Sequence, residues 1–405
     1  MSHPAGGPVL DRAPLLHELV RRGWRRMARA GVTRGVHPAW FGYRWIRHDT
    51  VQGYLAQHGR SSGLHYETVH RETVASNPLP SNITSRDALP GDHGWWGYSF
   101  RDVPARTSSE TFVLTLPDAL IVWYHDPARG HDFYPAIVTH DGCALDLREL
   151  RFRPLHAEVL RRAWRPARIA HATWILERVY HNHSHWLTAH LPKVLLLRER
   201  EGLDEVLLPR QRTSGIDGSL RRLGLAPEAF PAFAFDRPLR VEQLTILGTD
   251  RFQPELLRQV PRAYGVPARA RAGRRIFISR AKAARRRLVN EEEVWPILGR
   301  AGFERVCMED LTFDEQVDLM HDTAVLCAPH GAGLTNMMFC PPGCHVVEFA
   351  DLSFPNPNFY ALASAMRHHY WLLPARPLGD CHPLEKDLLV EPTALSECLS
   401  GLPSS

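Results

Sequence analysis

The chain has 405 residues, of which 44% are hydrophobic and 23% are charged, and its net charge is +5. This balance is typical of a globular protein of two or three domains, and it excludes a fibrous repeat, a disulfide-stabilised mini-protein and a wholly disordered chain. We expect no transmembrane helix, because no stretch of about 18 uncharged apolar residues occurs. The first residues lack the uninterrupted apolar core of a signal peptide, so a cytoplasmic protein is expected.

Arginine supplies nearly all of the positive charge, since the only lysines are Lys193, Lys282 and Lys386. The base composition of a GC-rich genome accounts for such a bias, so only local clusters of arginines carry functional weight. The seven cysteines are scattered. Cys340 and Cys344 form a close pair, but no second pair completes a zinc-binding pattern. We therefore expect reduced, mostly buried thiols.

The first predicted element is an amphipathic helix over residues 14–30. Leucines and Trp24 and Met27 form its apolar face, and five arginines occupy the other side. Such a helix suits the surface of an anionic membrane, but its apolar face could equally pack on the C-terminal helix of the same chain. The remainder of an N-terminal extension, up to residue 110, has weak periodicity and is expected to be irregular.

An α/β domain is predicted over residues 111–265, followed by a linker at 266–274. Its expected strands lie at 112–116, 119–123, 136–139, 169–176, 203–208 and 239–247, and its expected helices at 156–162, 184–199, 220–225 and 254–264. Asp141-Gly142 predicts a hairpin turn.

A Rossmann-like domain is predicted over residues 275–375, followed by a C-terminal tail or helix over 376–405. Strands are expected at 275–279, 303–308, 324–328, 345–349 and 370–373, and helices at 290–300, 312–321 and 358–368. Alternation of strands with helices of about ten residues indicates βαβ units and a parallel sheet. Asn290 is the expected N-cap of the first helix, and Thr312 with Glu315 predicts a capping box on the second.

The strongest local motif is a glycine-rich turn, His330-Gly331-Ala332-Gly333-Leu334-Thr335-Asn336, between a buried strand and a helix. Such a turn presents backbone N–H groups and a positive helix end to an anion at the carboxyl edge of a parallel sheet. The two glycines permit close approach of the ligand. The motif matches neither the dinucleotide fingerprint nor a Walker loop, and a tight turn without a ligand is the alternative.

Charged residues flank this turn. Arg280 and Arg287 belong to a segment, 278–287, that leaves the first strand with five cations, which suits a diphosphate without a metal. Glu348 ends the neighbouring strand, where a carboxylate is well placed for ribose hydroxyls. The alternatives are a solvated basic loop, a nucleic-acid patch and a surface glutamate.

Four histidines, His181, His183, His185 and His190, lie in the segment 180–192. Their spacing does not match a metallo-hydrolase motif, and the segment contains no carboxylate. Three interpretations stay open: a metal site, polar residues at a helix start, and the wall of a cleft with a catalytic or acceptor-binding histidine.

With these motifs in order, the sequence resembles glycosyltransferase family 61, which includes bacterial capsular-polysaccharide transferases, plant xylan arabinosyl- and xylosyltransferases and animal protein O-GlcNAc transferases. The resemblance spans roughly residues 112–399. Its marks are His330–Asn336 with Glu348 downstream, Ser279-Arg280 with Arg287, Asn290-Glu291, Gly302-Phe303 and Gln316, and Asn182-x-x-His185-Trp186-Leu187 with Leu191-Pro192. One departure is Ala189, at a position where many members carry an aspartate.

The resemblance implies a GT-B-like α/β fold, with two Rossmann-like domains facing a cleft, and an inverting, metal-independent hexosyl- or pentosyltransferase without a cofactor. The donor would be a nucleoside-diphosphate sugar. The acceptor would be a hydroxyl of a bacterial surface glycan of the capsule, exopolysaccharide or lipopolysaccharide type, free or lipid-linked, at the inner face of the cytoplasmic membrane. No nucleic-acid partner is expected. The alternative is a degenerate homologue that binds nucleotide or glycan without turnover.

We assign roles to the motif residues on this basis. His185 is the expected general base and His330 a second catalytic residue, and Asn182 and Trp186 lie on the acceptor side. The expected donor-binding residues are Arg280, Arg287, Gly331, Ala332, Gly333, Leu334, Thr335, Asn336 and Glu348.

Overall fold

A computed structural model of the chain describes residues 23–24, 26–32, 34–42, 46–59, 63–92, 96–126, 132–160, 165–270 and 273–403. The chain divides into two compact units. Unit 1 comprises residues 1–61, 117–170 and 236–242, and unit 2 comprises residues 62–116, 171–235 and 243–405. The domain boundaries at 110, 265–274 and 375 stay a prediction, because compactness alone does not show where an independently folding domain ends.

Unit 1 is built on a small mixed sheet. Its elements are η1 (Pro38–Phe41), β1 (Arg47–Thr50), α2 (Val51–His58), the later part of β5 (Thr111–Asp126), β6 (Asp132–Val138), β7 (Cys143–Asp146) and α3 (His156–Leu160). Strand β6 pairs antiparallel with β5 and β7, and β1 pairs parallel with β7. The predicted turn at Asp141-Gly142 is confirmed, and Gly142 has a φ of 81°, which favours glycine. The two strands predicted within 112–123 form one continuous strand.

Most of the helix predicted over residues 14–30 lies outside the described residues. Its described end, 26–32, is helical. Ala28 is buried in an apolar cluster with residues of β5 and β6, among them Leu120 and Val138. Trp24 and Met27, from the predicted apolar face, are 45% and 53% exposed.

Unit 2 begins with short elements around a helical region. They are β2 (His65–His70), β3 (Thr73–Val74), η2 (Arg86–Ala88), η3 (Val103–Ala105), β4 (Thr107–Ser108), β8 (Ala167–Trp174), α4 (His183–His185), the π turn η5 (Trp186–His190), α5 (Leu191–Glu199), β9 (Leu208–Pro209), α6 (Ser214–Arg222), η6 (Pro227–Ala229), β10 (Ala232–Phe233), β11 (Leu239–Gly248), α7 (Pro254–Leu257) and α8 (Gln259–Ala263). Strands β5, β8 and β11 contain residues of both units.

Two predictions in this region were wrong in their bounds. Of the strand expected over 203–208, only Leu208 lies in a strand, the two-residue β9. The helix expected over 220–225 begins earlier, because the Thr213 side chain accepts a hydrogen bond from the Ile216 N–H and starts α6 there.

Asn82 lies in the segment that was expected to be irregular, and its side chain forms two hydrogen bonds with the backbone of Leu372. Asn82 Nδ2 donates to the Leu372 carbonyl (2.8 Å), and Asn82 Oδ1 accepts from the Leu372 N–H (3.0 Å).

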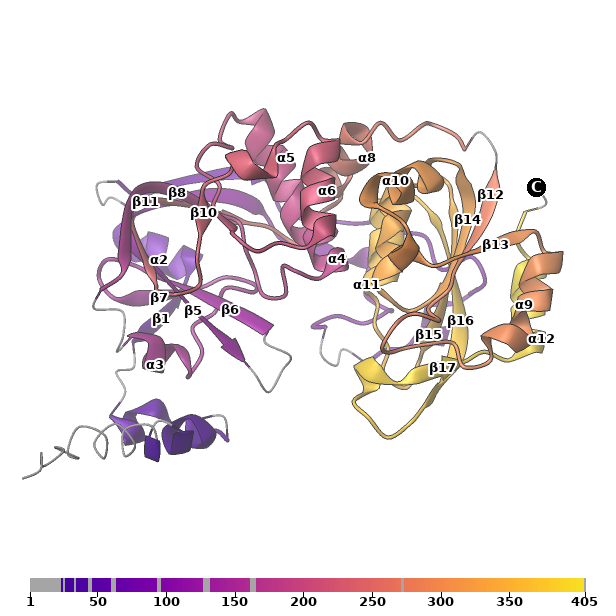
Figure 1. Cartoon of the computed structure of the whole chain (residues 1–405), viewed down its shortest axis with the longest axis horizontal. Helices are drawn as coiled ribbons and strands as arrows, with labels where there is room; N and C mark the ends of the chain where they lie inside the picture. Colours follow the sequence, from indigo (N-terminus) through magenta and orange to yellow (C-terminus); the bar gives the residue numbers. More distant parts are fainter. Residues whose placement is uncertain are drawn as a thin grey trace, which may run out of the picture. The chain divides into compact units, whose positions relative to one another are not determined.

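The predicted parallel sheet is present in unit 2. Its elements are β12 (Arg274–Ile278), α9 (Glu291–Arg300), β13 (Phe303–Val306), η7 (Met308–Asp310), α10 (Phe313–His321), β14 (Thr323–Pro329), η8 (Ala332–Phe339), β15 (His345–Asp351), α11 (Asn358–Ala365), β16 (His369–Leu378), η9 (Pro383–Glu385), β17 (Asp387–Leu389) and α12 (Pro392–Ser400). The strand order is β13-β12-β14-β15-β16-β17, and β17, which pairs antiparallel with β16, closes one edge. Helices α9 and α12 cover one face of the sheet, and α10 and α11 cover the other (Figure 1).

The chain is therefore a mixed α/β protein, as predicted. The GT-B arrangement stays a proposal, because β5, β6 and β7 pair antiparallel, whereas a second Rossmann-like sheet would be parallel. In the part of the chain that the structure describes, no helix combines the length and apolarity needed to cross a bilayer.

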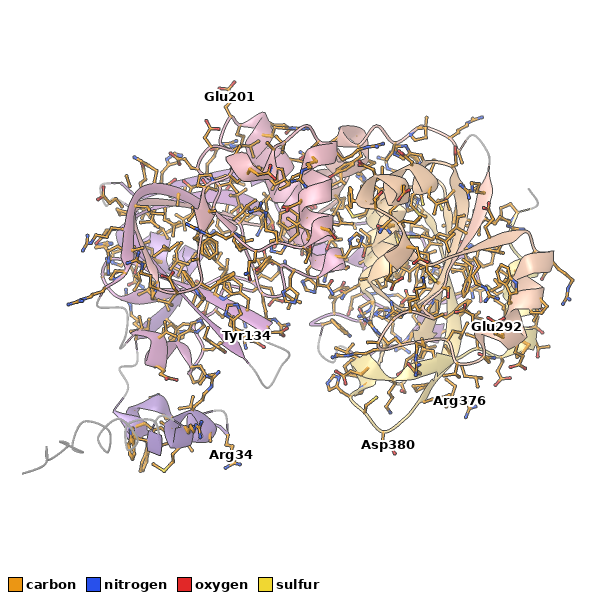
Figure 2. All side chains as sticks on the ribbon, in the orientation of Figure 1. Arg34, Tyr134, Glu201, Glu292, Arg376 and Asp380 are labelled. Atoms are coloured by element: carbon orange, nitrogen blue, oxygen red, sulfur yellow. The ribbon has the colours of Figure 1, made fainter. Side chains whose placement is uncertain are left out.

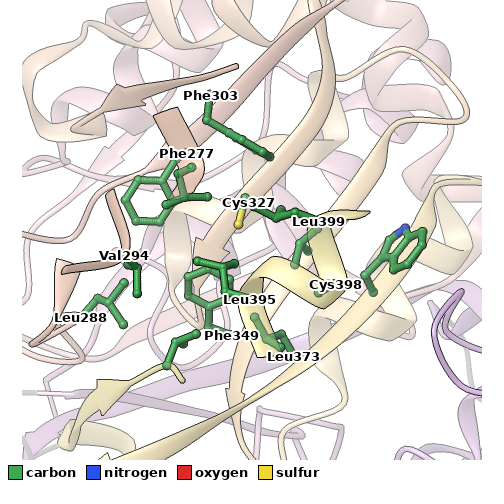
Figure 3. Close-up of a cluster of buried hydrophobic side chains, with 14 of the residues drawn as sticks. Phe277, Leu288, Val294, Phe303, Cys327, Phe349, Leu373, Leu395, Cys398 and Leu399 are labelled. Carbon is green, nitrogen blue, oxygen red and sulfur yellow. The ribbon is translucent and has the colours of Figure 1, made fainter. Parts of the chain in front are cut away.

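The core of the parallel sheet lies between its strands and helices α9 and α12. Leu395 and Leu399 of α12 pack in one cluster with Phe349, Phe277 and Cys327 of the strands (Figure 3). Full burial of such a side chain contributes about 1.5–3 kcal/mol. Charged side chains of the same unit, such as Glu292 and Arg376, are exposed (Figure 2). Helices cover both faces of this sheet, and strand β14 is therefore apolar at successive positions and not only at alternate ones.

The expected N-cap role of Asn290 was wrong in its detail. Its side chain makes no cap hydrogen bond to α9. The amide instead donates from Nδ2 to the Val390 carbonyl (2.8 Å) and accepts from the Val390 N–H (3.2 Å). Asn290 thus joins the start of α9 to the end of β17.

The capping box of α10 is present as predicted. The Thr312 side chain accepts from the Glu315 N–H, and the Glu315 side chain accepts from the Thr312 N–H. Thr312→Ala removes the first of these bonds and should cost about 1 kcal/mol, which lowers the thermal midpoint. Thr312→Ser keeps the hydroxyl and should melt close to the wild type. Equal melting of the Ala and Ser variants would contradict the cap assignment.

Candidate active site

A cavity of about 360 Å³ opens in unit 2 at the carboxyl edge of the parallel sheet. This size falls within the range of small-molecule sites. Five segments supply its lining: the π-turn region, the start of α6, the end of β12, the η7–α10 region and the glycine-rich turn. The lining residues are His181, His183, Trp186, Thr213, Ser214, Gly215, Ile216, Ile278, Ser279, Arg280, Met308, Glu309, Leu311, Gln316, Ala332, Gly333 and Asn336.

Arg280 is held against the glycine-rich turn. Its Nε–H donates to the Arg286 carbonyl (2.9 Å) and its Nη2–H to the Arg285 carbonyl (2.8 Å). A Cβ added at Gly331 would lie 2.2 Å from Arg280 Nη1, so the absence of a side chain at residue 331 lets the guanidinium approach. Burial lowers the pKa of Arg280, although an arginine stays charged at neutral pH. The structure therefore fixes a cation beside the glycine-rich turn.

Arg286 shapes this arrangement and was missed by the sequence analysis. It is a non-glycine residue with a φ of 55°, in the left-handed region, and its carbonyl accepts from Arg280. Burial and the neighbouring Arg280 and Arg285 lower its pKa to about 10. A left-handed arginine gives no local sequence signal, because Gly or Asn is the residue expected there.

A chain of side-chain amides connects the glycine-rich turn to α4. Gln316 Nε2 donates to the carbonyls of Met308 (2.9 Å) and Leu311 (3.2 Å). Its Oε1 accepts from Asn336 Nδ2 (3.0 Å), and Asn336 Oδ1 lies 2.8 Å from His183 Nε2. Asn336 itself is fully buried.

This chain determines the tautomer of His183. A carbonyl can only accept, so Gln316 Nε2 must be the donor to Met308 and Leu311, and Gln316 Oε1 must accept from Asn336. Asn336 Oδ1 is then the acceptor that faces the imidazole, and His183 Nε2 must carry the proton. Burial lowers the pKa of His183 below 6.5, although the bond to Asn336 acts in the opposite direction. At neutral pH the ring is therefore uncharged, with a lone pair on Nδ1.

Trp186 and Asn182 have structural partners. The Asn182 side chain caps α4 by accepting from the N–H groups of Ser184 (3.0 Å) and His185 (3.3 Å). Trp186 lines the cavity but is only 2% exposed, and its indole N–H donates to Ser219 Oγ (2.8 Å). The acceptor-side role predicted for both residues stays a prediction.

The helix predicted over 184–199 contains a wide π turn at Trp186–His190, a feature often found at functional sites. The Leu191 N–H bonds to the Trp186 carbonyl, five residues earlier. Pro192 follows and has no N–H to continue the regular pattern. The His190 ring has structural bonds: Nε2 accepts from the Glu177 N–H (3.0 Å), so Nδ1–H donates to the His185 carbonyl (2.9 Å).

His185, the predicted base, is not among the residues that line the cavity. Its Nε2 lies 3.4 Å from Arg251 Nη1. A guanidinium can only donate, so this nitrogen acts as an acceptor toward arginine. Arg251 also donates to Thr188 Oγ1 (2.6 Å) and Ser184 Oγ (2.8 Å) and so ties His185 into the turn.

His330 and Glu348 are brought together, but neither lines the cavity of about 360 Å³. His330 Nδ1 bonds to Glu348 Oε1, and its Nε2 lies 3.0 Å from Asn356 Nδ2. Glu348 is fully buried, and its Oε2 accepts from the Tyr370 hydroxyl (2.6 Å). Glu348 is not among the residues that line the larger cavity described above, and its expected ribose contact stays a prediction. His330 lines a small separate cavity of about 30 Å³ with Arg286.

The remaining predicted donor residues have mixed placements. Arg287 pairs with Asp387 through Nη2 (2.8 Å) and is exposed, outside the lining of the cavity. Ala332, Gly333 and Asn336 line the cavity, whereas Leu334 and Thr335 are fully buried. Within the described ranges, no three His, Cys, Asp or Glu side chains are grouped so that they could hold a metal ion.

Comparison with known proteins identifies the family. Residues 183–347 match the sequence model of the family described as Glycosyltransferase 61. This match places residues 183–347 in the glycosyltransferase 61 family. The matched region contains the cavity residues from His183 to Asn336, including Arg280 and the glycine-rich turn.

A curated relative is a β-1,2-xylosyltransferase of Arabidopsis thaliana. It is 29% identical over 90 residues, which are 19% of this chain. The alignment spans only 17% of the length of the plant protein.

The tautomer of His183 can be measured directly. The measurement is NMR of the protein labelled with ¹⁵N-histidine, and the His183 signals are those that disappear in a His183→Gln variant. At pH 7 these signals should show a neutral ring with its proton on Nε2. The reason is that burial disfavours the imidazolium, and Asn336 Oδ1 requires a donor on Nε2. A charged ring, or a proton on Nδ1, would contradict the network.

Proposed function

We propose that the chain is an inverting glycosyltransferase that moves a sugar from a nucleoside diphosphate to a hydroxyl acceptor. The observation that carries this proposal is the Arg280 guanidinium, fixed by two backbone carbonyls beside Gly331 in the family-matched region. The cavity next to it has room for a small molecule and lies where parallel sheets bind ligands.

Departure of the diphosphate concentrates negative charge on its oxygens. Arg280 Nη1 and the backbone N–H groups at the start of η8 would stabilise this charge, because the first N–H groups of a helix have no partner within the helix. The groups are fixed before the reaction, so little reorganisation is needed. The protein itself supplies the positive charge in this arrangement, and we propose that no metal ion or other cofactor is required.

Several finer features belong to the same proposal. The domains would adopt a GT-B arrangement, and the acceptor would be a bacterial surface glycan, free or lipid-linked. A pentose donor is the first candidate, because the plant relative is named as a xylosyltransferase. Trp24 and Met27, which are exposed beside an arginine-rich segment, support peripheral contact with an anionic membrane on the cytoplasmic side.

A degenerate homologue that binds nucleotide without turnover is the second candidate. Ala189 favours it, because this buried residue stands where many family members carry an aspartate. Turnover of a nucleotide sugar by the purified chain separates the two candidates.

The donor assignment predicts a graded loss of affinity at Arg280. Arg280→Ala removes a charge-assisted hydrogen bond of about 1.5–3 kcal/mol and should weaken UDP or GDP binding roughly ten- to a hundredfold. Arg280→Lys should recover only part of the affinity, because an ammonium does not reproduce a planar guanidinium. Calorimetric titration of each variant is the measurement.

A matched control is Arg274→Ala, which removes an arginine at the opposite end of β12, paired with Glu304. It should leave nucleotide affinity unchanged. If Arg280→Ala binds as tightly as Arg274→Ala, the donor site lies elsewhere.

Metal independence gives a separate prediction. Exhaustive chelation with EDTA should leave turnover of a nucleotide sugar within about twofold, because we propose that Arg280 and the turn take the place of a divalent ion. A loss of activity that is restored by Mn²⁺ or Zn²⁺ would contradict this part of the proposal, and the histidines of the 181–190 segment would then be examined first.

A further inference from the structure

The cavity carries two kinds of chemistry from different elements. Arg280 and the glycine-rich turn supply positive charge, and His183 of α4 supplies an uncharged imidazole. A glycosyl transfer with inversion needs both, because the leaving diphosphate needs cations and the entering hydroxyl needs a base.

The Nδ1 lone pair of His183 is available to such a hydroxyl. The carbonyls of Met308 and Leu311 fix the orientation of Gln316, which fixes Asn336, and Asn336 in turn places the ring proton on Nε2. Within the described part of the chain, no side chain or carbonyl is bonded to Nδ1.

Gly215 lies beside this nitrogen. A Cβ added at Gly215 would lie 3.8 Å from His183 Nδ1, an ordinary van der Waals contact, so the glycine leaves a wider approach to this atom than an alanine would. Gly215 lies in the first turn of α6 and does not have a positive φ, so no backbone conformation there requires glycine. Glycine is a poor helix former, at a cost of about 1 kcal/mol.

We propose that His183 is the general base of the transfer, and that Asn336 and Gln316 are positioning residues that act through it. This inference rests on the proposed function. In the step, the acceptor oxygen bonds to the anomeric carbon while its proton passes to His183 Nδ1. The bond from that carbon to the phosphate oxygen breaks, and its electron pair leaves with the diphosphate.

The surroundings of His183 suit this role. The ionisable side chains that line the same cavity are His181, Arg280 and Glu309. The ring of Phe313 in α10 packs edge to face with the His183 imidazole, with 6.4 Å between the ring centres. Asn336 in η8 forms a hydrogen bond with the same imidazole. Burial lowers the pKa of the imidazole, so the base form predominates at neutral pH. A base in this position also removes the need for a carboxylate at residue 189.

The first test separates binding from turnover. The probes are UDP-xylose, UDP-N-acetylglucosamine and GDP-mannose, with water as the acceptor. His183→Gln should lower kcat for the sugar nucleotide that the wild type hydrolyses by about a hundredfold or more, because a positioned base contributes roughly 10²–10⁴ in rate. Its affinity for UDP or GDP should stay within about threefold of the wild type. His65→Gln, an exposed histidine of β2, is the control and should change neither quantity.

The second test acts on His183 through its hydrogen-bond partner Asn336. Asn336→Asp places a negative charge next to His183 Nε2–H, which stabilises the imidazolium and raises its pKa. The base form then exists only at higher pH, so the acidic limb of the kcat profile should move up by about one pH unit or more. A purely structural role for Asn336 would lower kcat at every pH and leave the limb in place.

The outcomes separate the two levels of the argument. If the wild type binds UDP or GDP and hydrolyses a probe, but His183→Gln keeps its kcat within threefold, the base assignment is wrong and the proposed function stands. Loss of nucleotide affinity in His183→Gln, or an unmoved acidic limb in Asn336→Asp, also overturns it. A wild type that neither binds nor hydrolyses any probe overturns the proposed function itself. If His183→Gln does not fold, the Asn336→Asp profile decides alone.

Discussion

The Asn336 side chain is the interaction on which the site depends. It lies in the glycine-rich turn, fully buried, and its amide bonds to Gln316 near the start of α10 and to His183 at the start of α4. An unpaired amide in such a place would cost about 1–3 kcal/mol, so the three segments are held in one arrangement. The same bonds that satisfy Asn336 determine which nitrogen of His183 carries a proton. One side chain therefore determines both how the three segments pack and which tautomer His183 adopts.

Arg280, which also lines the cavity, is likewise held in one orientation by hydrogen bonds to the protein. Its two bonds to the carbonyls of Arg285 and Arg286 restrain a long side chain that would otherwise lose rotamer entropy when it binds an anion. The loop can supply both carbonyls because Arg286 adopts a left-handed conformation. Gly331 then gives the guanidinium its place beside the turn. In each wall, a backbone carbonyl ultimately fixes the orientation of the functional group.

The sequence predicted those features that depend on local patterns. Alternating apolar strands and amphipathic helices gave the parallel sheet, and Thr312 with Glu315 gave the capping box of α10, because both signals lie within a few residues. The glycine-rich turn was placed correctly at the end of β14, since a buried strand followed by glycines has few other conformations.

Features that depend on distant partners could not be predicted. Glu348 lies inside β15 and not at the end of a strand as expected, and its burial against His330 and Tyr370 depends on residues 18 and 22 positions away. His185 stood in the motif, yet Arg251 and not the cavity faces its Nε2. His183 was one of four histidines in the segment 180–192, and the sequence did not single it out, because its bond to Asn336 spans 153 positions.

The most direct measurement of the central claim is a crystal structure of the chain with UDP and with the sugar nucleotide that it hydrolyses. The account predicts that the diphosphate oxygens lie about 3 Å from Arg280 Nη1 and contact the N–H groups at the start of η8. The sugar ring should then lie in the cavity that His183 lines. A nucleotide bound elsewhere, or a diphosphate without contact to Arg280, would contradict the account.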